Sequence, residues 1–355
     1  MIARSKTAGL RALAVVMLAA SCWVLAARAE TMDQLYEKAK AEKALVFYSG
    51  GPVAPYERWA KEFEARFPGI TVSVTGGFSN VLDDKINQQL KAKKLEVDMA
   101  ILQTVQDFVG WKKRGALLRF KPEGFSKIDH RFRDEDGAFM ATTVVLLSYA
   151  YNTKLVPAKD VPKSALDFLK PQFRGKLVTA YPADDDATLF VFDDIVKKYG
   201  WSYMKKYMAN QPTFIQGHLG VLRAIAEGKS AVTFDSTSST TAGLKQAGEP
   251  IEFAFPTDDT MPVFFITAGI FKLAPHPNAA KLFLTWYLAK EQQSRLGGSF
   301  SSRTDVPPPA GLKPLKAYRI DAGYKQFVTN EKRLVALRKR FEALTGPVVN
   351  KGGVK

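Results

Sequence analysis

The sequence predicts an α/β fold made of two lobes, with the second lobe inserted into the first. Strand-like apolar runs alternate with helix-like segments between residues 32 and 102, and the same alternation returns between residues 177 and 234. Alternation at this spacing favours βαβ units, which build a largely parallel sheet covered by helices. Between the two blocks, the long apolar run Ala141–Tyr151 is suited to crossing from one lobe to the other.

The first block contains three predicted strands, Ala44–Tyr48, Ile70–Val74 and Val97–Leu102. Trp59, Phe63 and Phe67 recur at helical spacing, which predicts a helix that ends at Pro68–Gly69. A second amphipathic helix begins after the following strand, and Ser79 or Asn80 can cap it.

The second block contains the predicted strands Leu177–Ala180 and Ala231–Phe234. A helix that starts near Asp186 is expected to stop at Gly200, because glycine commonly ends helices. Two later extended stretches, 251–255 and 263–271, can return the chain to the first lobe. The expected first lobe therefore comprises residues 30–143 and 264–355, and the expected second lobe comprises residues 144–263.

Residues 1–29 have the layout of a secretory signal peptide. Basic residues without acids precede an apolar run that is too short to span a bilayer, and small residues surround Ala29. We expect cleavage after Ala29 and export to the periplasm. The alternative is that Cys22 carries a lipid anchor. Cleavage would leave a chain without cysteine, which suits an oxidising compartment.

The composition is ordinary for a globular protein, with 46% hydrophobic and 24% charged residues. The single cysteine excludes disulfide scaffolds and sites that need several cysteines around zinc or an iron–sulfur cluster. The sequence contains no phosphate loop, nucleophile elbow, dinucleotide-binding glycine motif or zinc-protease motif. Its basic residues are scattered despite a net charge of +16, so nucleic acid is not an expected partner.

Five polar loops follow predicted strands or start predicted helices: Ser49–Gly51, Gly77–Asn80, Gln103–Thr104, Asp184–Thr188 and Asp235–Ser238. In an open α/β sheet, ligands bind beyond the carboxyl ends of the strands, where helix N-termini present free N–H groups. Each loop alone can be a simple turn or cap, but five of them in two lobes predict a cleft. The expected ligand contacts are Ser49, Gly50, Gly51, Ser79, Asn80 and Gln103 in the first lobe, Tyr149 in the crossing, and Thr188, Gln216, His218, Asp235 and Ser236 in the second lobe.

Two of these features have structural alternatives. His218 starts a predicted helix, where it can contact a ligand or act only as a capping or surface residue. The acids Asp184–Asp186 can simply stabilise a helix dipole, or they can form a site for a cation or an amine. The sequence leaves both alternatives open.

Several short segments occur in an order and spacing that are familiar: Val46–Gly50, Phe63–Ile70, Val97–Ala100, Ala150–Thr153, Phe173–Leu177, Ala226–Val232 and His276–Leu284. Together they resemble the type II periplasmic solute-binding proteins of ABC transporters. The branch that includes ferric-iron, polyamine, phosphonate and sugar-phosphate binders is the most similar. The resemblance implies two lobes, each a mixed and mostly parallel sheet flanked by helices, joined by two hinge crossings. It also implies a monomer without cofactor or enzymatic activity that delivers a small solute to an inner-membrane ABC permease.

The sequence departs from the iron-binding members at the expected ligand site. Those members hold the metal with two adjacent tyrosines after the strand that corresponds to Ala231–Phe234, whereas this chain has Asp235–Ser238 there. Ferric iron prefers anionic oxygen ligands, so neutral hydroxyls suit a carboxylate, phosphate or phosphonate better. Ferric iron and a polyamine remain alternative ligands, with no metal site assigned. A secreted enzyme that uses His218 and Asp235 as an acid–base pair remains the alternative of another class.

Overall fold

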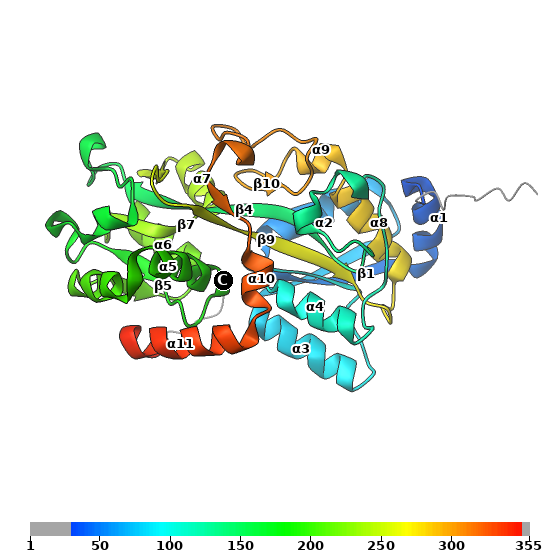
Figure 1. Cartoon of the computed structure of the whole chain (residues 1–355). Coiled ribbons are helices and arrows are strands. Elements are labelled where there is room, and N and C mark those ends of the chain that lie inside the picture. Colours follow the sequence, from blue (N-terminus) through cyan, green and yellow to red (C-terminus); the bar gives the residue numbers. More distant parts are fainter. Residues whose placement is uncertain (1–29, 350–355) are drawn as a thin grey trace, which may run out of the picture.

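The computed structural model describes residues 30–349 and shows a mixed α/β molecule with two lobes (Figure 1). Two long strands, β4 (Met140–Asn152) and β9 (Met261–Ile270), run through both lobes and pair with each other antiparallel. The predicted signal peptide and Cys22 lie outside the described residues. Within residues 30–349, no helix has the length and apolar character needed to cross a membrane.

The first lobe has a parallel core sheet. Strand β1 (Ala44–Gly50) pairs in parallel with β2 (Thr71–Gly77) and β3 (Met99–Leu102), and β3 pairs antiparallel with β9. The helices α1 (Met32–Glu42), α2 (Ala54–Arg66) and α8 (Pro277–Tyr287) share one hydrophobic core, whereas α3 (Ser79–Lys91) and α4 (Val105–Lys113) belong to the other. This two-sided coverage explains why the strands are apolar on both faces.

One predicted cap in this lobe is wrong. Helix α3 begins at Ser79, so Phe78 occupies the N-cap position and no side chain caps the helix. Ser79 and Asn80 are already helical, and the Ser79 hydroxyl instead accepts a hydrogen bond from the Gln103 N–H at 3.2 Å.

The second lobe contains the parallel pair β5 (Val178–Ala180) and β6 (Thr213–Ile215). Strands β7 (Val232–Thr237) and β8 (Ile251–Ala254) pair antiparallel with the far half of β4. Helices α5 (Asp186–Ala209), α6 (His218–Ala226) and α7 (Ser238–Gln246) surround these strands. Gly200 interrupts α5 with a φ of 75°, so the predicted helix end at this glycine is a sharp kink between two helical segments.

The predicted crossing between the lobes is confirmed in β4. Residues 140–146 of β4 pair with β9, whereas from Leu147 onward β4 pairs with β7 and β8. The strand therefore changes partners near its middle, and two continuous strands connect the lobes. The boundaries expected at residues 143/144 and 263/264 stay a prediction.

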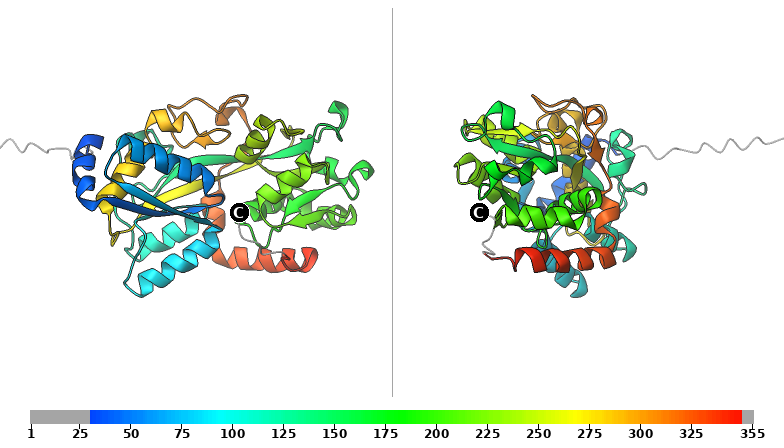
Figure 2. Two further views of the ribbon diagram at one scale, coloured as in Figure 1. Left: turned by 180° about the vertical axis from the view of Figure 1, so that it is seen from behind. Right: turned by 60° about the vertical axis from the view of Figure 1, so that its left-hand side comes forward.

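The C-terminal segment returns to the second lobe. Helices α10 (Tyr324–Val328) and α11 (Glu331–Thr345) follow the short helix α9 (Lys290–Gln293) and the short strands β10 (Phe300–Ser301) and β11 (Ile320–Asp321). Helix α11 runs beneath the second lobe in both views of Figure 2 and packs on α5, although its sequence lies in the segment expected in the first lobe. Short 3-10 helices occupy connections at Phe125–Lys127, His130–Phe132, Ala158–Asp160, Ala165–Leu169, Pro171–Phe173 and Leu315–Ala317.

Candidate functional site

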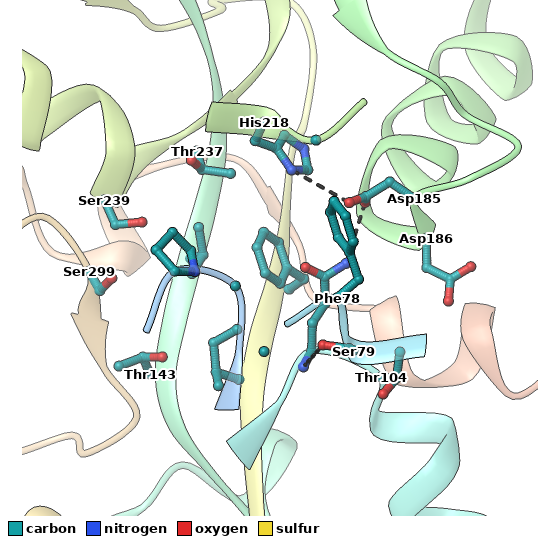
Figure 3. A pocket seen from close by; sticks show the side chains of 18 of the residues that line it. Phe78, Ser79, Thr104, Thr143, Asp185, Asp186, His218, Thr237, Ser239 and Ser299 are labelled. Atoms are coloured by element: carbon teal, nitrogen blue, oxygen red, sulfur yellow. Dashed lines mark hydrogen bonds and ion pairs between the residues drawn. The ribbon is translucent and has the colours of Figure 1, made fainter. Parts of the chain in front are cut away.

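A cavity of about 1310 Å³ lies between the lobes (Figure 3). Its first-lobe wall comes from the end of β1 and from the starts of α3 and α4. Its second-lobe wall comes from the starts of α5, α6 and α7, and residues of β4 and β9 form part of the lining. At the end of β1, Gly50 approaches the start of α3 closely, because a Cβ there would lie 2.3 Å from the hydroxyl of Ser79 and that hydroxyl would have to move. The cavity thus lies where the chain changes from strand to helix several times.

Four helices start at this cavity without a side-chain cap. Their N-cap residues all line the cavity: Phe78 for α3, Thr104 for α4, Gly217 for α6 and Thr237 for α7. In each case no side chain accepts a hydrogen bond from the first turn. Uncapped first turns present N–H donors and the positive end of the helix dipole. Their convergence makes the cavity suited to an anion.

Unpartnered hydroxyl groups add further donors. Thr143 of β4, Ser239 of α7 and Ser299 line the cavity (Figure 3). Within residues 30–349, none of these three side chains makes a hydrogen bond to the protein. Thr237 differs, because its hydroxyl donates to Thr240 at 2.9 Å. Three neutral donors are therefore free to bind a ligand without the cost of desolvating a charge.

His218 carries a positive charge on the second-lobe wall. Its Nε2 lies 2.9 Å from the Asp235 carboxylate, and its Nδ1 lies 3.6 Å from that of Asp185. Burial alone would lower the pKa of the imidazole, but the two carboxylates outweigh burial and raise the pKa to about 9. The ring is therefore an imidazolium at neutral pH, and it stacks on Phe264 with the planes 16° apart.

The Asp235 carboxylate is fully buried behind this histidine and is saturated with donors. It accepts hydrogen bonds from the Ala180 N–H at 3.0 Å and from the Thr188 hydroxyl at 2.9 Å. Burial alone would raise the pKa of Asp235, but His218 and these donors lower it below its usual value. The arrangement fixes α5, β5 and β7 together and leaves Asp235 no free lone pair toward the cavity.

Acidic groups gather at the other end of the cavity, on α3 and α4. We call Asp83 and Asp107 the carboxyl pair. Burial, aided by the neighbouring Asp84, raises the pKa of Asp83 to about 6. Burial and the charge of Asp83 raise the pKa of Asp107 to about 7. Across the cavity, Asp186 of α5 accepts hydrogen bonds from Gln106 at 2.8 Å and from Arg338 of α11.

The expected ligand contacts divide into two groups. The cavity lining includes Gly50, Gly51, Ser79, Asn80, Gln103 and His218. The other expected residues, Ser49, Tyr149, Thr188, Gln216, Asp235 and Ser236, do not line it. As direct ligand contacts, all twelve stay predictions.

The residues outside the lining are occupied by protein partners or buried. Tyr149 donates to Asp259 at 2.7 Å beside a separate cavity of about 100 Å³. Gln216 donates to Asp184 at 2.7 Å, and Ser236 lies 2.7 Å from the hydroxyl of Thr241. Ser49 is fully buried in β1.

Several lining residues escaped the sequence prediction. Thr143 is one of the few polar residues in the mostly apolar run Ala141–Tyr151, and Ser299 follows two glycines, Gly297 and Gly298. A polar residue within a crossing strand and a serine after a glycine pair were the available signals. Ser239 lies one position beyond the predicted loop Asp235–Ser238. Phe78 lies within the predicted loop Gly77–Asn80 but was not among the expected ligand contacts, because an aromatic residue more often belongs to a core.

No metal centre is evident in the described part of the chain. Within residues 30–349, no three His, Cys, Asp or Glu side chains are placed to hold a metal ion. The two tyrosines in the cavity lining are Tyr56 and Tyr287, and burial raises the pKa of both phenols above the usual value. Both phenols are therefore protonated at neutral pH.

Comparisons with known proteins show the family of the chain. The family model described as bacterial extracellular solute-binding protein matches residues 58–318. The Fe(3+)-binding periplasmic protein of Serratia marcescens is 22% identical over 314 residues, which cover 85% of this chain and 91% of that protein. A probable ABC transporter periplasmic-binding protein of Sinorhizobium fredii, y4fP, is 19% identical over 268 residues, covering 72% of this chain and 73% of that protein.

A solved structure shows the same fold. The periplasmic binding protein AfuA from Actinobacillus pleuropneumoniae, with exogenous fructose-6-phosphate bound, matches with a TM-score of 0.71 and 18% identity. The match covers 86% of this chain and 99% of that one. The overall fold of this chain is therefore shared with that structure.

Proposed function

The chain belongs to the family of bacterial extracellular solute-binding proteins, and from this premise we propose that its cavity captures a small organic anion of the carboxylate or phosphate type. The solute would be held between the lobes in the periplasm, after removal of residues 1–29, and delivered to an inner-membrane ABC permease. The chain would act as a monomer. The names of the Serratia and Sinorhizobium relatives support a periplasmic binding role in ABC import.

One observation carries the choice of an anion: four uncapped helix N-termini converge on a single cavity. Each contributes N–H donors and about half a positive charge at the start of the helix. The free hydroxyls of Thr143, Ser239 and Ser299 lie in the same lining. Donors of this kind bind oxyanions in many proteins, and the fructose-6-phosphate in AfuA is such an anion.

Two other ligands of the family are less well supported by the geometry. Ferric iron would need anionic oxygen ligands, but within residues 30–349 no three His, Cys, Asp or Glu side chains are placed to hold a metal ion, and Asp235 is saturated by protein donors. A polyamine would need charged carboxylates that are free of cations, but Asp185 faces His218 and Asp186 is paired with Arg338. The two lining carboxyls without such a partner, Asp83 and Asp107, have pKa values raised to about 6 and about 7, so they are partly protonated near neutral pH.

A secreted enzyme is also disfavoured as a function. A general base must be deprotonated near neutral pH. His218 has a pKa of about 9, because two carboxylates hold its proton. The same pair that resembled an acid–base couple in sequence is therefore better explained as a structural ion pair.

The test is a loss of affinity when the free hydroxyls are removed. Native mass spectrometry of the gently purified protein would first identify the retained solute, and calorimetry would then measure its Kd. The double variant Thr143→Val/Ser239→Ala should weaken binding by at least about 100-fold, because each hydrogen bond to a charged group contributes about 1.5–3 kcal/mol.

The control is Thr71→Val/Ser73→Ala, which makes the same exchanges at exposed positions on β2. Its Kd should equal that of the parent protein. Retention of iron or of an amine, or an unchanged Kd in the cavity variant, would contradict the proposal.

A further inference from the structure

Two side-chain hydrogen bonds span the cavity between α4 of the first lobe and α5 of the second. Gln106 donates to Asp186 at 2.8 Å, and Gln103 donates to Asp185 at 3.4 Å. The bond from Gln106 is the shorter of the two and is therefore the stronger. Asp185 is also engaged at the helix start, where it accepts from two N–H groups of α5. Gln106 and Asp186 therefore make the more direct contact between the lobes.

The C-terminal helix supports this contact from outside. Arg338 of α11 donates to the second oxygen of Asp186, so this carboxylate is shared between α4 and α11. Asp186 is only 7% exposed, whereas the Arg338 side chain is 41% exposed. The C-terminal helix thus fixes a buried acceptor onto which the first lobe can close.

The carboxyl pair lies on α3 and α4, and its negative charge opposes the contact between Gln106 and Asp186. Asp107 follows Gln106 directly on α4, and its charge interacts unfavourably with those of Asp83 and Asp186. Charged or titratable groups from both lobes face this region. In the first lobe they are Asp83 on α3, Asp107 and Lys113 on α4, and Arg114 at the end of α4. On the other side they are Asp185 and Asp186 at the start of α5, Tyr324 on α10, and Glu331 and Arg338 on α11. Within the described residues, neither member of the pair forms an ion pair with a lysine or arginine within 4 Å.

We propose that the hydrogen bond from Gln106 to Asp186 is a latch that holds the two lobes together in the absence of solute. Arg338 keeps the Asp186 carboxylate in place, and negative charge on Asp107 weakens the latch. Because Asp107 has a pKa of about 7 and Asp83 one of about 6, the charge that opposes closure grows between pH 6 and 8. Closure of the free protein should therefore be favoured in mild acid.

This proposal rests on the binding function above only in that the lobes open and close, and its measurement needs no ligand. Small-angle X-ray scattering of the ligand-free protein reports opening as an increase in the radius of gyration. Gln106→Glu places a carboxylate against Asp186, so at pH 7.5 its radius of gyration should exceed that of the parent. At pH 5 the excess should shrink, because the adjacent Asp186 carboxylate raises the pKa of the new carboxyl and keeps part of it protonated.

The matched control is Gln88→Glu on the exposed side of α3, which adds the same charge to the same lobe. It should leave the scattering unchanged at both pH values. Asp107→Asn should act in the opposite direction, with a radius of gyration that stays small from pH 6 to 8. If Gln106→Glu fails to fold, Gln106→Leu removes the hydrogen bond without adding charge and should open the protein at both pH values.

The proposal is overturned if Gln106→Glu scatters like Gln88→Glu at pH 7.5, or if Asp107→Asn becomes more open. Failure of the proposed anion binding would leave these scattering results unchanged, because no solute is present. The two proposals therefore fail separately.

Discussion

At the scale of single residues, His218 in the cavity wall has a strongly raised pKa. Its side chain is only 10% exposed and lies between the carboxylates of Asp235 and Asp185. The sequence placed this histidine at a helix start and left open whether it binds a ligand. It could not show that two acids from distant segments would hold its proton, because that depends on how β7 and α5 pack against α6.

The ion pair should make folding stability fall in alkaline solution. The folded-state pKa of His218 is raised from 6.5 to about 9, so its contribution is complete below pH 6.5 and is lost as pH rises through 9. The loss amounts to about 3 kcal/mol. Urea unfolding at pH 6 and 9.5 should show this difference in the parent protein, and His218→Gln should lack it.

The exposed His130 is the reference for this measurement, since its side chain is 78% exposed. His130→Gln should retain the full alkaline loss. A parent and a His218→Gln protein that lose equal stability over this pH range would show that the pair contributes nothing.

At the scale of elements, the start of α7 depends on a close approach by the segment that follows α9. A Cβ on Gly298 would lie 2.4 Å from the Cβ of Ala242 and 2.8 Å from the Ser238 carbonyl oxygen. This contact places Ser299 beside the first turn of α7. Ser299 and Ser239, which belongs to that turn, line the cavity. A glycine here allows two segments from different parts of the chain to share one wall of the site.

Gly298→Ala should therefore destabilise the protein by about 1–3 kcal/mol, the usual cost of overpacking, and weaken solute binding. Gly243→Ala on the same helix is the control, because no atom lies within 4 Å of its added Cβ and alanine favours helix by up to about 1 kcal/mol. Thermal unfolding and calorimetry would compare the two. Equal stability in both variants would rule out the close contact.

The sequence predicted the helices and strands better than it predicted the residues of the site. The apolar run Ala141–Tyr151 predicted a strand shared by both lobes, because it is too long for one sheet, and β4 has this form. The sequence predicted that the helix beginning near Asp186 ends at Gly200, whereas the structure has a kink there and the chain continues as helix to Ala209. The site was less predictable. Tyr149 is a polar residue whose partner, Asp259, comes from a distant segment, and the hydroxyl of Ser236 pairs with that of Thr241 in α7.

At the scale of the whole molecule, α11 shows what periodicity cannot determine. Its apolar spacing predicts a helix but not the lobe on which the helix packs. In the structure Phe341 is fully buried, with its ring centroid 5.2 Å from that of Phe192 and 5.0 Å from that of Trp201. Arg333 of the same helix donates to the buried Asp193 at 2.6 Å. A segment that follows the first lobe in sequence is therefore anchored to the second.

Removing the buried Phe341 side chain should detach α11 from the second lobe and allow the two lobes to separate. Phe341→Ala should cost about 3–5 kcal/mol, as expected for a fully buried phenylalanine, whereas Val335→Ala, at a side chain 59% exposed, should change stability by less than about 0.5 kcal/mol. Because α11 also carries Arg338, its release would leave Asp186 without its arginine partner, so the radius of gyration of the ligand-free protein should increase. Limited proteolysis should then cut first within residues 331–345, before the body of either lobe. Cleavage that begins elsewhere, or an unchanged radius of gyration despite cleavage in α11, would show that the helix covers the second lobe without controlling how the lobes meet.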